Sequence, residues 1–336
     1  MKVVCTWYAT QEETDAIKAV LPADAQIVVP QGKYLSRFDC TYATLRPHLA
    51  EADVIMGWAL PNGTLEAANK VKLLNWIHSG CDGLDVRLLK ERGTRVASAR
   101  GANAAAIAEQ AMMFVLALAK ATIVKHQALQ QGRWLFPLWG EDRSAMLSGR
   151  TVGVIGVGSI GGLIAKAAKG FGMRVIGVRR HKEQPAECVD AMHGLDELRS
   201  VLPQCDYVVL AVPNTEETYD LFGEEELAAM KPSAFLVNVA RPALVQEQPL
   251  YDALTTGRLR GYAADVWRRY EYGRAFPIGF MPRLEVHKLP NVIGSLMEAH
   301  DADDVLERNL QLAIENLAEF VAGKRMTREI DLERGY

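Results

Sequence analysis

A glycine-rich turn between a short apolar run and a helical pattern constrains the fold of this chain most. The turn spaces its glycines as Gly-x-Gly-x-x-Gly from Gly156 to Gly161, between the apolar run Thr151–Ile155 and the helical segment Ser159–Phe171. Gly156 permits a tight turn off a strand, Gly158 lets a pyrophosphate approach the backbone, and Gly161 lets the helix pack closely on the strand. A second strand-like run, Met173–Val178, follows at the spacing of a β-α-β unit. The pattern therefore predicts a parallel sheet with a dinucleotide site whose first contacts are Gly156, Gly158, Ser159 and Ile160.

The residues after that second run bear on the choice of dinucleotide. A site specific for NAD places an acidic residue there to accept hydrogen bonds from the ribose hydroxyls. Here Arg179 and Arg180 follow Val178, and an arginine can clamp a 2′-phosphate with paired donors. We expect NADP(H) to be preferred, with NAD(H) possible; the alternative for these arginines is a solvated basic turn.

Two series of short β-branched runs, each alternating with helical segments, predict an α/β fold with two parallel sheets. The first series is Lys2–Tyr8, Asp53–Ala59, Leu73–Ser79 and Arg95–Ser98; the second adds Tyr207–Val212, Ala234–Val239 and Gly261–Val266 to the runs around the glycine turn. Helical patterns also cover Glu224–Met230, a long segment that Asn103 can cap, and a final segment, Asp303–Ala322. We expect two Rossmann-like domains: residues 1–100 plus 300–336 as a substrate domain completed by the C-terminal helix, and residues 101–299 as the dinucleotide-binding domain.

Composition excludes several classes of protein. The 336 residues hold 38 Lys and Arg against 41 Asp and Glu, a net charge of −3, so neither a general nucleic-acid binder nor a polybasic membrane-surface protein is expected. Five cysteines are scattered without a Cys-x-x-Cys pair, which argues against a disulfide framework or zinc site and favours a reducing cytoplasm. No secretory peptide is apparent, and no uncharged apolar run reaches the ~20 residues of a membrane span. We expect a cytoplasmic protein without a metal.

Several further motifs give the chain a resemblance to a known family over nearly its whole length. They are residues 78–85 (HSGCDGLD), 108–110 (AEQ), 211–215 (AVPNT) with Thr218, 237–241 (VNVAR) and 261–266 (GYAADV). With the glycine turn, they resemble the D-isomer-specific 2-hydroxyacid dehydrogenase family, which includes glyoxylate/hydroxypyruvate reductases, phosphoglycerate dehydrogenase and phosphite dehydrogenase.

The resemblance implies roles for residues of both domains. The loop of Ser79 and Gly80, beside His78, would present backbone donors to a substrate carboxylate. Arg241 would hold the carboxylate and the reacting carbonyl oxygen, where hydride transfer builds negative charge that a fixed cation stabilises. Asp265 would orient the nicotinamide carboxamide. The remaining residues that the resemblance places along the cofactor are Val212, Pro213, Thr218 and Ala240.

The chain departs from the family at its acid/base pair. Relatives use a histidine whose pKa is raised by a glutamate. Here Tyr270 stands in the glutamate's place with Glu271 one residue later, and Met297 stands in the histidine's place. Methionine transfers no proton, so Met297 is expected only to pack against the substrate or the nicotinamide, as a substrate-binding residue. The substitutes for the missing acid are His300, which would share a helical face with Met297, then Glu298, Glu271, Tyr270, His287 and His78. His300 and Glu298 could instead cap the last helix, and Tyr270 could pack at an interface.

A second departure is the stretch 267–290, which is rich in basic residues. Its acidic residues are Glu271 and Glu285, and its basic residues are Arg268, Arg269, Arg274, Arg283 and Lys288. One interpretation is that these arginines line the cleft and bind a second anionic group on the substrate. The other is a solvated basic loop at a subunit contact.

The sequence thus predicts an oxidoreductase that transfers a hydride between NADP(H) and a small anionic 2-keto or 2-hydroxy acid, with an atypical proton donor. The alternatives are a dehydrogenase of a phosphorus-containing acid or aldehyde hydrate, and a non-catalytic NADP(H)-binding sensor. The helix after Asn103 and the segment around Trp134 and Trp139 predict a homodimer, since exposed tryptophan-bearing surface is typical of an interface.

Overall fold

A computed structural model describes residues 1–31, 38, 40–81, 83–134, 143–268 and 283–334. The chain divides into two compact units. Met1–Asn103 with Asp303–Tyr336 form the five-stranded unit, and Ala104–Ala302 form the seven-stranded unit. Both contain one parallel sheet, so the predicted α/β class with two parallel sheets is confirmed.

The five-stranded unit has the strand order β2-β1-β3-β4-β5, and all neighbours pair in parallel. Parallel strands are buried on both faces and are therefore apolar along their whole length, as in β3, where all four residues are buried. Its elements are β1 (Lys2–Cys5), α1 (Gln11–Lys18), β2 (Gln26–Val28), α2 (Tyr42–Leu49), β3 (Val54–Gly57), α3 (Thr64–Ala67), β4 (Leu73–Trp76), α4 (Val86–Glu91), β5 (Arg95–Ser98) and α11 (Val305–Val321).

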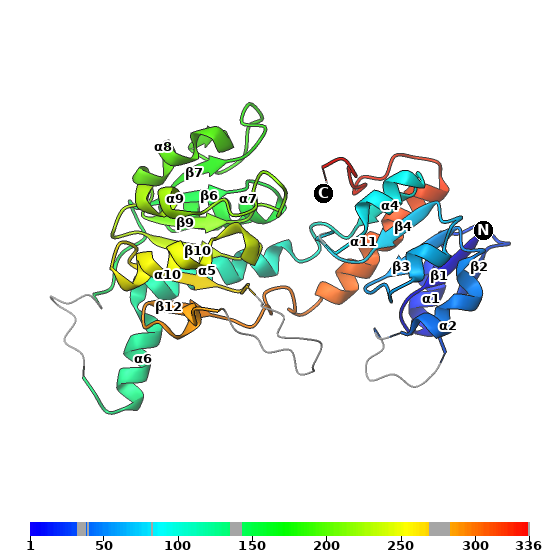
Figure 1. Cartoon of the computed structure of the whole chain (residues 1–336), viewed down its shortest axis with the longest axis horizontal. Helices are drawn as coiled ribbons and strands as arrows, with labels where there is room; N and C mark the ends of the chain where they lie inside the picture. The colour runs from blue at the N-terminus through cyan, green and yellow to red at the C-terminus, as the bar shows by residue number, and fades with distance from the viewer. Residues whose placement is uncertain (32–37, 39, 82, 135–142, 269–282, 335–336) are drawn as a thin grey trace. The chain divides into compact units, whose positions relative to one another are not determined.

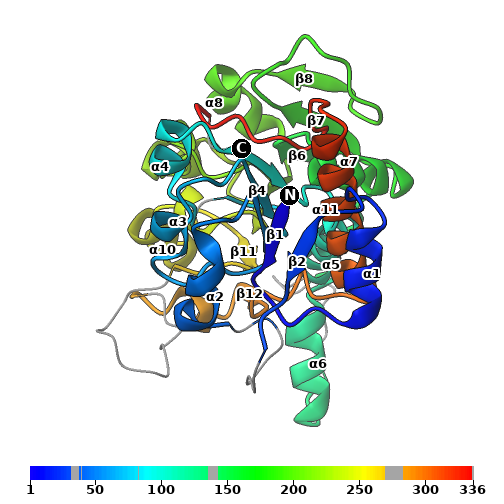
Figure 2. The ribbon, with the colours of Figure 1, turned by 90° about the vertical axis from the view of Figure 1, so that its right-hand side faces the viewer.

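Helices cover both faces of this sheet (Figure 2). Ile17 of α1 and Leu312 and Leu317 of α11 pack on one face, and Leu45 of α2 and Leu89 of α4 pack on the other. The C-terminal helix therefore supplies part of the core of the N-terminal sheet.

Buried amides attach α11 to the strands. Asn75 of β4 donates from Nδ2 to the carbonyl of Ala313 over 2.7 Å, and Asn316 donates from Nδ2 to the carbonyl of Ser98 over 2.9 Å. Both asparagines are fully buried, so each hydrogen bond satisfies a group that would otherwise cost free energy in the core. These bonds fix the register of α11 on β4 and β5.

The seven-stranded unit has the strand order β12-β11-β10-β9-β6-β7-β8, again all parallel (Figure 1). Its main elements are α5 (Ala104–Lys120), α6 (Thr122–Gln130), β6 (Thr151–Ile155), α7 (Ser159–Gly170), β7 (Arg174–Val178), β8 (Ala191–His193), α8 (Leu198–Val201), β9 (Tyr207–Leu210), α9 (Glu224–Ala229), β10 (Phe235–Asn238), α10 (Glu247–Thr255), β11 (Gly261–Ala264) and β12 (Val292–Gly294). Short 3₁₀ turns occupy Leu195–Glu197, Leu202–Gln204, Pro242–Leu244 and Val286–Lys288.

The two faces of this sheet carry separate cores. Residues of α5 and α7, among them Phe114 and Ile164, pack on one face, and residues of α8, α9 and α10, among them Leu227 and Leu250, pack on the other. The strand order reverses at β6, which has β7 on one side and β9 on the other. Such a reversal opens a crevice beyond the carboxyl ends of the strands, where ligands of doubly wound sheets bind.

Most predicted elements occur close to their expected bounds. β5 and β6 begin and end at the predicted residues, whereas the other predicted strands are shorter by one to three residues, as in β1. β2 and β8 were not predicted: each has three residues, half-buried or exposed, at the edge of its sheet. The last helix begins at Val305 rather than at Asp303.

In the described part of the chain, no single helix has the length and apolar composition to cross a membrane. Only α5 and α6 taken together pass that test, and they are bent by 63° relative to each other.

Candidate active site

The glycine turn after β6 has the close approaches that its sequence predicts. Gly156 has a φ of +101°, and a Cβ there would lie 2.6 Å from the carbonyl of Ala211. A Cβ on Gly161 would lie 1.9 Å from the carbonyl oxygen of Gly156. Gly158 is different, because a Cβ there would meet no atom within 4 Å. Two of the three glycines are thus required by packing inside the chain, and the third borders open space.

That open space lies at the N-terminus of α7. Gly158 is the N-cap, and Ser159 and Ile160 form the first turn, whose N–H groups have no acceptor within the helix. A helix N-terminus attracts anions through these groups and through the helix dipole. The turn therefore fits the pyrophosphate of a dinucleotide.

The arginines after β7 have different partners. Arg179 Nε donates to the carbonyl of His181 over 3.0 Å, and its other donors reach the carbonyls of Val157, Gln184 and Pro185. These acceptors are neutral, so none of them compensates the positive charge of the guanidinium beside the glycine turn. Arg180 Nη2 instead lies 2.6 Å from the carboxylate of Glu217. Of the two predicted phosphate ligands, Arg180 is thus paired with a carboxylate, whereas these hydrogen bonds of Arg179 go to neutral carbonyls.

The turn after β9 is closed by a buried threonine. Thr218 Oγ1 donates to the carbonyl of Pro213 over 2.7 Å and accepts from the N–H of Thr215 over 2.8 Å. This closure holds the backbone of Val212 and Pro213 in place at the crevice. The Oδ1 atom of Asn214 is buried there with no hydrogen-bond partner in the described residues. An unsatisfied buried acceptor calls for a donor, and Asn214 is a site residue to which the sequence analysis gave no role.

Arg241 sits on a turn that Asn238 holds. Asn238 is fully buried at the end of β10; its Nδ2 donates to the carbonyl of Arg241 over 2.9 Å, and its Oδ1 accepts from the N–H of Ala240 over 3.0 Å. The N–H of Asp265, after the neighbouring strand β11, donates to the carbonyl of Asn238 over 3.1 Å. Arg241 and Asp265 are thereby fixed at adjacent strand ends.

Asp265 is a buried carboxylate with several donors. Only 4% of its surface is exposed. Its Oδ1 accepts from Ser295 Oγ over 2.6 Å and from the N–H of Glu298 over 3.0 Å, and its Oδ2 accepts from the N–H of Ala299 over 3.2 Å. Burying a charge is costly unless hydrogen bonds satisfy it, and these donors satisfy the carboxylate of Asp265 and fix its orientation.

The same contacts correct the prediction that Met297 and His300 share a helical face. Met297 has a φ of +62° and donates its N–H to the carbonyl of Asp265 over 2.9 Å. The backbone curves around Asp265 and cannot continue as a helix, since a left-handed residue interrupts one. His300 is exposed in the following turn. The alternative that His300 or Glu298 caps the last helix is also wrong, because Asp304 is the N-cap of α11.

The predicted carboxylate loop belongs to the five-stranded unit. Ser79 Oγ donates to Asn103 Oδ1 over 2.8 Å, and Trp76 Nε1 donates to the carbonyl of Gly80 over 2.9 Å. His78 Nε2 lies 2.7 Å from the carbonyl of Trp58; since a carbonyl only accepts, Nε2 carries the proton and donates it. Within the described residues, the N–H groups of Ser79 and Gly80 have no backbone acceptor.

Part of the basic stretch 267–290 lies outside the described residues, and so do Tyr270, Glu271, Arg269 and Arg274. Arg268 pairs with Asp220 and donates from Nε to the carbonyl of Val245 over 3.1 Å. Lys288 lies 2.6 Å from Glu285. These two cations are engaged within the unit, so neither supports the prediction of a second anion site.

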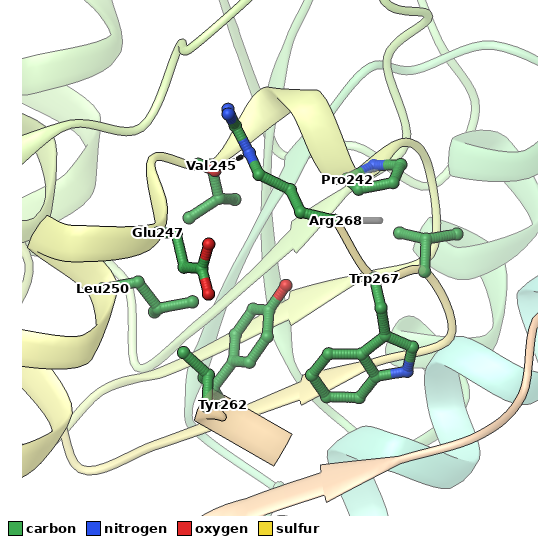
Figure 3. A pocket seen from close by; sticks show the side chains of 9 residues that line it. Pro242, Val245, Glu247, Leu250, Tyr262, Trp267 and Arg268 are labelled. Carbon is green, nitrogen blue, oxygen red and sulfur yellow. Dashed lines mark hydrogen bonds between the residues drawn. The ribbon is translucent and has the colours of Figure 1, made fainter. Parts of the chain in front are cut away.

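A pocket of about 320 Å³, including its opening to solvent, lies beneath the Pro242–Leu244 turn that follows Arg241. Its lining is Pro242, Val245, Glu247, Leu250, Tyr262, Val266, Trp267, Arg268 and Val286. Figure 3 shows the Tyr262 hydroxyl directed into it. Burial raises the pKa of this phenol well above its usual range, so Tyr262 stays neutral at physiological pH.

The residues present fit a nicotinamide dinucleotide. The open space at Gly158, the N-terminus of α7, the charge of Arg179 and the unsatisfied Asn214 Oδ1 all belong to the seven-stranded unit and surround the carboxyl ends of its strands. Among the described residues, no group of three His, Cys, Asp or Glu side chains could hold a metal ion.

A dinucleotide turn at a strand reversal, beside an arginine and a buried aspartate at adjacent strand ends, defines an NAD(P)-dependent oxidoreductase of the Rossmann type. Residues 112–295 match the sequence profile described as "D-isomer specific 2-hydroxyacid dehydrogenase, NAD binding domain". The chain belongs to this family, and the predicted resemblance is confirmed.

Individual relatives agree with this assignment. The chain is 33% identical over 262 residues to D-3-phosphoglycerate dehydrogenase of Methanocaldococcus jannaschii, which covers 75% of this chain and 47% of that protein. It is 33% identical over 270 residues to glyoxylate reductase of Korarchaeum cryptofilum, which covers 77% of this chain and 76% of that one. The fold is similar to that of the acyclic imino acid reductase Bsp5 in complex with NADPH and D-Arg. The TM-score is 0.78, and the match covers 98% of this chain and 100% of the other at 22% identity.

Proposed function

We propose that this protein uses NADP(H) to reduce a small anionic 2-keto acid, or to oxidise the corresponding 2-hydroxy acid. The observation that carries the proposal is the fixed pair of Arg241 and Asp265, which Asn238 holds at adjacent strand ends. Glyoxylate reductase of Korarchaeum cryptofilum, which covers three quarters of this chain, supports the substrate class.

The chain's own residues would orient the cofactor and stabilise the reacting atoms of the substrate. The bound cofactor supplies the hydride. Asp265 would receive the carboxamide N–H and so fix the face of the nicotinamide ring, and Arg241 would donate to the substrate carboxylate and carbonyl oxygen. A fixed cation at the oxygen stabilises the charge that develops there and reorganises little during the reaction.

The preference for NADP(H) rests on Arg179. Its guanidinium is held by neutral carbonyls, so its charge remains for a 2′-phosphate, whereas an aspartate there would repel one. Arg179→Asp should therefore reverse or erase a preference for NADPH over NADH. The measurement is the dissociation constant of each cofactor by fluorescence titration, and equal constants in the unmodified protein would refute the preference.

The proton donor for a keto acid is atypical, because Met297 stands where the family has its histidine. His300 and Tyr270 are the candidates that we propose to test. If His300 is the donor, His300→Ala lowers kcat strongly. If Tyr270 is the donor, Tyr270→Phe has that effect and His300→Ala does not. Two variants with unchanged kcat would exclude both.

A second candidate substrate, a 2-imino acid, is favoured by Met297. An iminium carbon accepts a hydride and its C=N electron pair moves to nitrogen, which already carries its protons, so the product is a neutral amine and the reaction needs no acid from the protein. NADPH is oxidised to NADP⁺ in the same step. The reductase Bsp5, whose fold this chain shares, is named for substrates of this kind. We infer that adding an amine to a keto acid accelerates NADPH consumption.

One panel of assays tests both substrates. NADPH absorbance is followed with glyoxylate, pyruvate and hydroxypyruvate, each with and without methylamine, and the products are identified by mass spectrometry. Hydroxy acid formation supports the first candidate, and N-methyl amino acid formation supports the second. Normal cofactor binding with no consumption across the panel would count against both, and would favour a non-catalytic sensor.

We also propose a homodimer. Helix α6 extends from the seven-stranded unit (Figure 1) and has one buried residue, Ala128, while Ile123 and Leu129 are exposed. Trp134 and Met146, which flank the undescribed part of the next segment, are also exposed. Covering these side chains would remove apolar surface from water. Light scattering should give twice the 37.0 kDa of one chain, and a value near 37.0 kDa at micromolar concentration would contradict the proposal.

A further inference from the structure

A chain of hydrogen bonds links helix α5 to Asp265. Gln110 Nε2 donates to Ser295 Oγ over 3.0 Å, and Ser295 Oγ lies 2.6 Å from Asp265 Oδ1. The amide nitrogen can only donate and the carboxylate can only accept, so the serine proton points to Asp265. We call Gln110, Ser295, Asp265 and the N–H groups of Glu298 and Ala299 the Asp265 network. It joins residues that are 185 positions apart in sequence.

The two carboxylate oxygens of Asp265 accept different numbers of hydrogen bonds. Oδ1 accepts from Ser295 Oγ at 2.6 Å, from Glu298 N–H at 3.0 Å and, more weakly, from Ala299 N–H at 3.4 Å. Among the residues that the structure describes, Oδ2 accepts only from Ala299 N–H, at 3.2 Å. A carboxylate oxygen has room for about two donors, so Oδ2 retains capacity for one more. Within the described residues Asp265 has no cationic partner, and hydrogen bonds alone stabilise its buried charge.

The network also shapes the segment that carries Met297. Trp267 Nε1 donates to the carbonyl of Ser295 over 2.8 Å, and Met297 N–H donates to the carbonyl of Asp265 over 2.9 Å. These bonds offset the left-handed φ of +62° at Met297, a conformation that costs a non-glycine residue free energy. If the hydrogen bond between Ser295 and Asp265 is removed, the left-handed conformation of Met297 is less stabilised.

We propose that Gln110 and Ser295 are positioning residues for the reaction. Gln110 orients the Ser295 hydroxyl, and the hydroxyl holds Oδ1 of Asp265, so that Oδ2 is presented to the carboxamide of the cofactor. The same bonds keep the Met297 segment in one conformation. The inference rests on the proposed function for the role of Asp265, and it gives a role to the Ala-Glu-Gln motif at residues 108–110, which the site otherwise leaves without one.

The test compares NADPH binding among variants of the full chain. Ser295→Ala removes the hydroxyl, Gln110→Leu removes the amide, and the double variant removes both. Ser295→Thr keeps the hydroxyl, and Gln127→Leu makes the same change as Gln110→Leu at an exposed position of α6. The readouts are the NADPH dissociation constant by fluorescence titration, the melting temperature, and amide hydrogen exchange at Glu298 and Ala299 without cofactor.

Each single variant should raise the NADPH dissociation constant about tenfold to one hundredfold, the size of one hydrogen bond to a charged group. Gln110 acts through Ser295, so the two changes should not add. The NADPH dissociation constant of the double variant should not exceed the larger of the two single-variant constants. Amide exchange at Glu298 and Ala299 should become about tenfold faster in Ser295→Ala. Ser295→Thr and Gln127→Leu should stay within about twofold of the unmodified protein in binding.

Binding within about twofold of the unmodified protein in both Ser295→Ala and Gln110→Leu would overturn the proposal, and so would effects that multiply in the double variant. If Ser295→Ala does not fold, Gln110→Leu and Ser295→Thr decide. An unmodified protein that binds no NADPH would refute the proposed function and, with it, the role of Oδ2. Equal binding by the unmodified protein and the variants would refute only the positioning role.

Discussion

Replacing Gly158 with alanine should weaken dinucleotide binding about one hundredfold and leave the free protein folded. A Cβ at Gly158 would meet no atom within 4 Å, and its φ of −107° suits a residue with a side chain. The methyl group would instead occupy the space into which the pyrophosphate must approach the backbone. The melting temperature without cofactor should therefore change by no more than about 2 °C.

The expected loss can be estimated from ligand linkage. NADPH at one hundred times its dissociation constant stabilises a protein by ~2.7 kcal/mol. For a domain of about 200 residues this raises the melting temperature by roughly 5–11 °C. If the methyl group weakens binding one hundredfold, the same NADPH concentration stabilises the variant by only ~0.4 kcal/mol, about 1 °C. Thermal unfolding with and without NADPH resolves this difference.

Gly162→Ala is the matched control. Gly162 lies in α7, where an added Cβ again meets no atom within 4 Å, but it is past the first turn of the helix. Alanine in a helix is favoured over glycine by about 0.8–1 kcal/mol, so this variant should melt slightly higher and keep the full NADPH shift. A Gly158→Ala protein that keeps more than half of the shift, or a Gly162→Ala protein that loses it, would refute the account of the turn.

Three further changes have defined outcomes. Arg241→Ala should lower kcat/KM by about 10²–10³ through loss of the cation at the developing oxyanion, with NADPH affinity unchanged; undiminished turnover would remove Arg241 from the reaction. Gly161→Ala should destabilise the free protein by about 1–3 kcal/mol, because its Cβ would lie 1.9 Å from the Gly156 carbonyl oxygen, and a melting temperature equal to that of the unmodified protein would contradict this. Hydrogen bonds lower the pKa of Glu197 to about 2. The largest effect comes from the N–H of Gly194, and smaller effects come from the side chains of Lys182 and His193. A lowered pKa stabilises the fold above pH 4.5, and this contribution is lost as the pH falls toward 2, so thermal melts of Glu197→Gln should change less over that range than those of the unmodified protein.

The fold could be predicted where the sequence pattern is strong along the whole element. β6 is buried at four of its five positions and precedes a glycine turn, so apolar pattern and turn chemistry agree there. β2 and β8 have three residues each and no fully buried position. Each of these strands pairs through its backbone with one neighbour at the sheet edge. This pairing does not require an alternating or continuous apolar pattern in the sequence.

The site could be predicted in part for a similar reason. Gly156 and Gly161 are required by local backbone contacts, which act over a few residues and therefore appear as a motif. Ser295 and Gln110 meet only after the whole seven-stranded unit has folded, and nothing near either residue indicates the other. The helical face predicted for Met297 and His300 was wrong because the hydrogen bonds to Asp265, more than thirty residues away in sequence, fix a left-handed φ at Met297.

The central claim is that this chain transfers a hydride from a nicotinamide to the carbon beside a carboxylate, and isotope transfer tests it most directly. NADPH is prepared with deuterium on either face of nicotinamide C4 and incubated with glyoxylate or pyruvate, with and without methylamine, and the product is analysed by mass spectrometry and NMR. The account predicts one deuterium at C2 of the hydroxy or amino acid from one of the two labelled cofactors, and none from deuterated water. Product that carries hydrogen from solvent at C2, or the absence of any product while NADPH is bound, would contradict it.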